Sequence, residues 1–87
     1  MKTVKLDNGF EVTIEPEMLD DMYFVEELAR LETDALALPN VMTMMFGEEQ
    51  KKALYKHLEN KDGRVKIEKV AEVVTEVMTK AGEDTKN

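Results

Sequence analysis

The stretch that decides the fold is the first one, residues 2–14, which reads KTVKLDNGFEVTI. Apolar and polar residues alternate on both sides of a turn cluster, which is typical of a β-hairpin. A two-residue loop, Asn8-Gly9, would set apolar against polar residues on both faces and is therefore disfavoured. A three-residue loop over residues 7–9 pairs like with like and lets Gly9 adopt the left-handed conformation. Its pairs are Leu6 with Phe10 and Val4 with Val12 on one face, and Lys5 with Glu11 and Thr3 with Thr13 on the other.

Helical periodicity follows the hairpin. Apolar residues at three- and four-residue steps predict helices at about 16–32, 38–46, 48–59 and 66–81. A break near Asp20-Asp21 is compatible with the first helix, and Gly47 is expected to end the second. Residues 60–63 predict a turn. The last helix is the clearest, with a stripe formed by Ile67, Val70, Ala71, Val74, Val77, Met78 and Ala81.

These elements predict one small globular domain over residues 1–82, followed by a frayed tail at 83–87 after Gly82 stops the last helix. A two-stranded hairpin (2–14) is marginal in water, so its apolar face must rest on the helices. The expected fold class is mainly α (α+β), with the N-terminal β-hairpin packed on a small bundle of about four helices.

The charge of the chain is concentrated in one segment. The whole chain has 19 acidic and 12 basic residues, for a net charge of −7. Residues 15–34 hold eight acidic residues and one basic residue, and therefore carry the entire net charge. An acidic balance argues against binding to nucleic acid or to an anionic membrane surface, because both need cationic side chains. A solvated helix face is the simplest interpretation of the acidic segment.

No feature of the sequence indicates catalysis, a metal or a cofactor. The chain has no cysteine, and His57 is its only histidine. Asn60, Asp62 and Gly63 have the spacing of part of a calcium loop, but Leu58 and Lys69 stand where that loop needs carboxylates. No apolar run approaches the roughly 18 residues of a membrane span, and Met1 leads into polar alternation. We expect a soluble, intracellular protein that is not an enzyme.

The methionines are more informative about function. Three of the seven, Met42, Met44 and Met45, lie beside Phe46 in a stretch without charge. Successive residues of a helix point about 100° apart, so this run is either buried on nearly all sides or partly exposed as an adaptable apolar surface. Both alternatives stay open. The candidate partner-binding residues are Leu38, Met42, Met45, Phe46, Met18 and Met22.

Three stretches of the chain, DALALP (34–39), FGEEQKKALY (46–55) and DGRV (62–65), resemble the small tail assembly chaperones of siphophages and prophages of Gram-positive bacteria. The resemblance implies a non-enzymatic protein of the bacterial cytoplasm that coats the helical tape measure protein and keeps it soluble during tail assembly. It also implies that a longer form, made by ribosomal frameshifting, recruits the tail tube protein.

Two other classes of function compete with this expectation. The acidic segment is compatible with a nucleic-acid mimic that inhibits a host protein, although mimicry needs carboxylates spread at phosphate-like spacing over a surface. The third class is a small structural adaptor or a subunit of a homo-oligomer. High salt separates the first two, since it weakens an ionic interface much more than an apolar groove.

Overall fold

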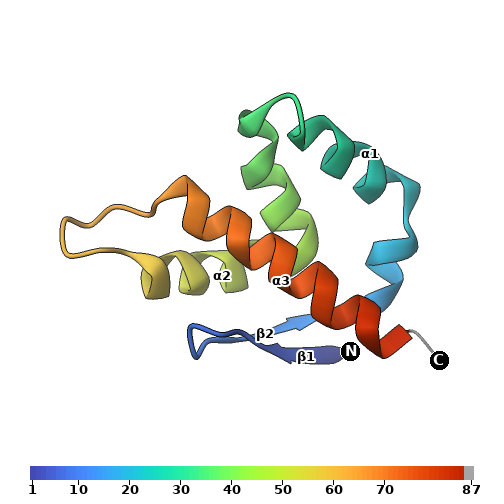
Figure 1. Cartoon of the computed structure of the whole chain (residues 1–87), viewed down its shortest axis with the longest axis horizontal. Coiled ribbons are helices and arrows are strands. Elements are labelled where there is room, and N and C mark those ends of the chain that lie inside the picture. Colours follow the sequence, from blue (N-terminus) through green and yellow to red (C-terminus); the bar gives the residue numbers. More distant parts are fainter. Residues whose placement is uncertain (86–87) are drawn as a thin grey trace.

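The computed structural model describes residues 1–85 (Figure 1). Two strands, β1 (Lys2–Lys5) and β2 (Glu11–Ile14), precede all of the helices. The helical elements are the 3-10 helix η1 (Pro16–Asp20), α1 (Met22–Leu31), the 3-10 helix η2 (Ala35–Ala37), α2 (Leu38–Leu58) and α3 (Ile67–Thr85). The fold is therefore mainly helical with an N-terminal antiparallel hairpin, as predicted, but it has three α-helices rather than about four.

The hairpin has the predicted register. Thr3 pairs with Thr13 and Val4 with Val12. The N–H of Leu6 donates to the carbonyl of Phe10 at 2.8 Å, which closes a loop of residues 7–9. Gly9 has φ of 93°, the left-handed conformation that this loop requires. The apolar pairs thus lie on one face, and that face is buried.

Side chains from two helices satisfy the outer edges of the hairpin. The side-chain amide of Gln50 on α2 accepts from Thr13 N–H at 2.7 Å and donates to the Thr13 carbonyl at 2.8 Å. At the other edge, Lys80 of α3 donates to the Lys5 carbonyl at 2.7 Å and pairs with Glu76 at 2.7 Å. These contacts replace the hydrogen bonds that a third strand would supply, because strand edges otherwise present unpaired backbone groups.

The first helical segment is interrupted at Asp21, close to the expected break. Asp21 has extended backbone angles, and its carboxylate accepts from the N–H of Tyr23 at 3.0 Å. The residue therefore ends η1 and caps the N-terminus of α1. Phe24 is the one residue of α1 that is buried, so this helix is only lightly anchored.

The two helices predicted at 38–46 and 48–59 form one bent element, α2. Gly47 has φ of 78° and ψ of 165°, outside the helical region, and helical structure continues on both sides of it up to Leu58. The predicted count of about four helices was too high because only this single residue departs from helical geometry. Pro39 lies in the first turn of α2, where its missing N–H is tolerated.

The last helix is longer than predicted. It begins at Ile67 and continues through Gly82 to Thr85, so the expected end at Ala81 was wrong. A glycine stop needs a left-handed residue, and Gly82 is not among the glycines with positive φ. The predicted tail at 83–87 is therefore helical as far as Thr85, and residues 86 and 87 lie outside the described residues.

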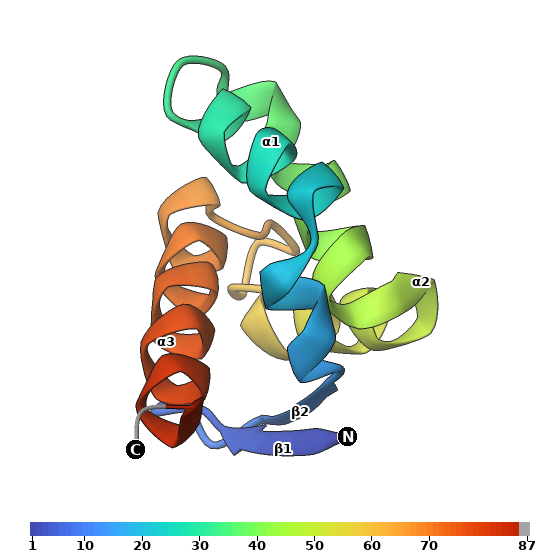
Figure 2. The same ribbon diagram turned by 90° about the vertical axis from the view of Figure 1, so that its right-hand side faces the viewer.

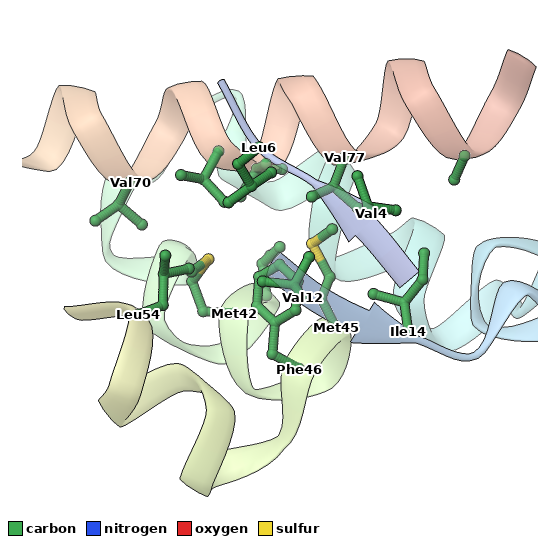
Figure 3. Close-up of a cluster of buried hydrophobic side chains, with 14 of the residues drawn as sticks. Val4, Leu6, Val12, Ile14, Met42, Met45, Phe46, Leu54, Val70 and Val77 are labelled. Atoms are coloured by element: carbon green, nitrogen blue, oxygen red, sulfur yellow. The ribbon is translucent and has the colours of Figure 1, made fainter. Parts of the chain in front are cut away.

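The core lies where the hairpin meets α2 and α3. Figure 2 shows the two helices on opposite sides of the molecule, with the hairpin at one end and α1 at the other. In the close-up of Figure 3, side chains of the hairpin, including Val4 and Val12, point among those of α2 and α3. Among the described residues, no polar side chain is buried. Hydrophobic burial therefore holds these elements together.

The Gln50 amide yields a first prediction. Gln50→Glu keeps the size of the side chain but removes the donor to the carbonyls of Thr13 and Phe46. We expect the free energy of unfolding in urea to fall by about 1–2 kcal/mol, because a half-buried backbone carbonyl loses its partner. The reverse change at the exposed neighbour, Glu49→Gln, should alter it by less than about 0.5 kcal/mol. Equal unfolding midpoints for the two variants would contradict this role for Gln50.

Candidate functional site

Four of the six predicted partner-binding residues belong to the core. Met42 is 0% exposed and Met45 is 4% exposed, and Leu38 and Phe46 are also buried. Figure 3 shows Met42 and Met45 pointing toward the hairpin and α3. The run from Met42 to Phe46 is thus buried on nearly all sides, and the alternative of a largely exposed apolar surface is wrong for these side chains.

The other two predicted residues do not join them in one surface. Met22 lies on α1 and is 66% exposed, whereas Met18 on η1 is half-buried against the core. A shallow hollow of about 380 Å³ beside the bend of α2 is lined in part by Met18, Met45 and Phe46. Only the outer parts of Met45 and Phe46 can reach this hollow, because both side chains are buried.

A separate apolar groove lies between α1 and α3. It has a volume of about 340 Å³, and its walls are Leu28 and Leu31 on α1 and Ala71, Val74 and Met78 on α3. Glu32, Thr75 and Thr79 complete its lining. We call this feature the α1–α3 groove. α1 packs mainly on α2, η1 and η2, while α3 packs on α2 and β1, so α2 supports both of the helices that form the walls.

Sequence reasoning missed this groove although it named part of one wall. The predicted apolar stripe of the last helix included Ile67, Ala71 and Met78. Ile67 is 67% exposed, Ala71 is exposed, and Met78 is half-buried. The signal that could have indicated the groove was the width of the stripe, which is broader than the buried face of α3. That buried face is formed by Val70, Val73, Val74, Val77 and Ala81. The remaining apolar residues face the groove or solvent.

One acidic side chain borders the α1–α3 groove. Glu32 is part of its lining. Glu68 of α3 is not part of this lining and instead lines a larger hollow beside the hairpin turn, described below. The only cation of residues 15–34, Arg30, pairs with Glu27 at 2.6 Å and with Asp34 at 3.1 Å. These two carboxylates occupy Arg30, so it leaves Glu32 unneutralised.

The ion pair between Arg30 and Glu27 changes the pKa values of both side chains. The hydrogen bond from Arg30, together with one from Asn40, lowers the pKa of the Glu27 carboxyl. The hydrogen bond to Glu27 in turn raises the pKa of Arg30 above its usual value. The Arg30 side chain is 50% exposed and that of Glu27 is 16% exposed. Solvent at Arg30 screens the pair, so its contribution to stability is small, but the contact keeps Glu27 ionised and Arg30 engaged.

A larger hollow, of about 920 Å³, lies on the neighbouring face of α3, beside the hairpin turn, and shares Ala71, Thr75 and Thr79 with the α1–α3 groove. Its lining is mostly charged and polar, and several of these groups already bind one another. Lys80 pairs with Glu76 at 2.7 Å and Asp7 at 3.3 Å, and Asp7 N–H donates to Glu76 at 2.6 Å. These contacts hold the turn against α3, so we assign this hollow a structural role.

The described residues do not gather groups suited to metal binding. No three His, Asp or Glu side chains within residues 1–85 are placed to hold an ion. His57 is exposed, and its Nε2 lies 3.1 Å from the carbonyl of Asn8, where the ring packs beside Phe10. None of the helices within this range combines the length and apolarity needed to cross a membrane. The α1–α3 groove, with its mainly apolar lining, is therefore taken as the candidate site.

Comparison with known proteins found no matching family model and no significant match to a curated protein or a solved structure.

The burial of the methionines yields a second prediction. Met42→Asp combined with Met45→Asp should abolish cooperative unfolding and most of the helical circular dichroism, since two carboxylates in the core cost more than a small domain can offset. Met22→Asp, at an exposed position of α1, should keep the wild-type spectrum. A folded double variant with a wild-type spectrum would show that these methionines lie at the surface and not in the core.

Proposed function

We propose that this protein is a non-enzymatic tail assembly chaperone that binds apolar helical segments of a tape measure protein and keeps them soluble during assembly in the bacterial cytoplasm. The observation that carries the proposal is the α1–α3 groove, an apolar channel between two helices that no other element of the described chain fills. The resemblance of residues 34–65 to tail assembly chaperones points to the same class of function.

The dimensions of the groove suit one face of a helix. Its lining on α3 extends from Ala71 to Thr79, which corresponds to about 12 Å, or two helical turns. A client helix can place residues i, i+3 or i+4, and i+7 along that distance. Met78 gives the wall a flexible, polarizable side chain that adapts to clients of different shape. Binding would be driven by burial of apolar area, at roughly 25 cal/mol per Å², less the cost of ordering.

The acidic segment supports the same proposal. Residues 15–34 carry the whole net charge of the chain, and most of their carboxylates are exposed on η1 and α1 or directly beside them. A chaperone that coats an apolar filament must keep the complex soluble, and a uniformly charged outer face does so by repulsion between neighbouring copies. A nucleic-acid mimic would bind its partner through these carboxylates, whereas a chaperone would bind its client through the apolar groove. The two functions therefore differ in which surface makes the contact.

The proposed function is tested by filling the groove without disturbing the core. Ala71→Trp places an indole ring in the groove at an exposed position of α3, so the fold should be retained. We expect co-purification with a co-expressed tape measure segment to fall at least about tenfold, because the ring occupies the space for the client. The matched control is Ala53→Trp, at an exposed alanine of α2 outside the groove, which should bind as wild type does.

Two outcomes would count against the proposal. Undiminished co-purification of the client with the Ala71→Trp variant would place client binding elsewhere. Failure of the wild-type chain to retain any tape measure segment, combined with tight binding to a basic protein that vanishes at high salt, would favour the acidic mimic.

A further inference from the structure

The hairpin loop, residues 7–9 between β1 and β2 (Figure 1), contains the one asparagine–glycine pair of the chain. Asn8 and Gly9 are both exposed. The backbone nitrogen of the residue after an asparagine can attack the side-chain amide, and glycine favours this attack because it has no Cβ to obstruct the approach. Val41 and Lys61 follow the other two described asparagines, and their side chains hinder the same reaction. Asn8 is therefore the described asparagine most prone to it.

The reaction needs only water as a second reactant. The Gly9 nitrogen, after losing its proton, bonds to Cγ of Asn8, the bond from Cγ to the amide nitrogen breaks, and ammonia leaves behind a cyclic imide. Water then opens the imide. Opening at Cγ gives aspartate, whereas opening at the backbone carbonyl carbon gives isoaspartate, whose main chain runs through the side chain. In sum, an amide and a water become a carboxylate and an ammonium ion, with no oxidation or reduction.

Hydrogen bonds within the loop engage both reacting groups. The Gly9 N–H donates to the carbonyl of Leu6 at 3.0 Å, so the nitrogen that must attack is already bound. The side-chain oxygen of Asn8 accepts from the Phe10 N–H at 2.9 Å, which fixes the side chain over the turn. Ring closure therefore requires the loop to open first, and its rate depends on how often the loop opens.

Contacts from two helices keep the loop closed. The Asp7 N–H donates to the carboxylate of Glu76 on α3 at 2.6 Å. Nε2 of His57, in the last turn of α2, lies 3.1 Å from the carbonyl oxygen of Asn8. The His57 ring also packs beside Phe10, with the ring centroids 5.1 Å apart. Opening the loop therefore breaks tertiary contacts as well as the hydrogen bonds of the turn.

We infer that Asn8 is a site of spontaneous deamidation, and that the contacts of the loop with His57 and Glu76 set the rate at which it reacts. Isoaspartate at this position lengthens the main chain by one carbon, in a loop whose length fixes the register of the hairpin. Either product also adds a negative charge to a hollow that Asp7 and Glu76 already line. We expect the modified loop to detach from α3. The inference does not depend on the proposed function.

The test follows Asn8 in the full chain during incubation at mildly alkaline pH. Trypsin cleaves after Lys5 and Arg30, so Asn8 lies in a peptide with no other asparagine. Chromatography with mass spectrometry separates its asparagine, aspartate and isoaspartate forms, and a digest at time zero corrects for conversion during handling. We expect Asn8 to react while Asn40 and Asn60 stay unchanged. Conversion should be at least about tenfold faster in guanidinium chloride than in buffer, because the unfolded chain has no closed loop.

Variants separate opening of the loop from unfolding of the whole domain. His57→Phe combined with Glu76→Ala keeps a ring beside Phe10 but removes both polar contacts with the loop. This variant should convert about tenfold faster than wild type, because two hydrogen bonds that keep the loop closed are lost. The matched control is Gln50→Glu, which weakens the hairpin at Thr13, away from the loop. The control should convert at the wild-type rate although it is less stable.

The two products differ in their effect on stability. Asn8→Asp carries the charge of the products on an ordinary main chain, releases no ammonium and provides a chromatographic standard. The isoaspartate fraction should unfold at a lower denaturant concentration than Asn8→Asp, because only isoaspartate lengthens the main chain of the loop.

Any of four results would overturn the inference. Conversion of Asn8 no faster than that of Asn60 in the denatured chain would remove the site. Equal rates in the native and denatured chain would show that the loop does not control the reaction. Equal acceleration by Gln50→Glu and by the double variant would assign control to unfolding of the whole domain. An isoaspartate fraction as stable as Asn8→Asp would show that the modified loop stays attached to α3.

Discussion

The structure depends on the burial of one face of a two-stranded hairpin between α2 and α3. Two strands cannot shield their own apolar side chains, so Val4 and Val12 are buried only because helices cover them. The edges of the strands impose a second requirement, which Gln50 meets from α2 and Lys80 meets from α3. Each helix is therefore attached to the hairpin twice, by its apolar face and by a hydrogen bond to a strand edge. The hairpin sets the positions of both.

The first helix is not held by this constraint. α1 packs on α2 and the two 3-10 helices, and Phe24 is its one buried residue. Because α1 has no strand edge to cap and little apolar surface in the core, it stays apart from α3 along one side. The α1–α3 groove results from this arrangement, with apolar walls at its centre and Glu32 at its border. The same helix provides both the acidic face and one wall of the groove.

Several features could be predicted because their causes are local. The register of the hairpin follows from alternation, since a slip by one residue would turn every side chain to the opposite face. The interruption near Asp21 follows from the tendency of a carboxylate to cap the next helix. The bend at Gly47 was placed correctly, but its consequence was not, because one left-handed residue can bend a helical element as well as end it. The extent of α3 beyond Gly82 was also missed, since a glycine permits a stop without requiring one.

The sequence by itself determined the strands, the turns, the approximate helices and the location of the charge, since these depend on residues a few positions apart. Only the tertiary structure decided which apolar side chains are covered. Met42 is buried because α2 turns this side chain toward the hairpin and α3, whereas Ala71 stays exposed on a similarly apolar stripe because α1 does not close over it. Burial depends on what stands opposite a side chain, and a periodic pattern records only which way that side chain points.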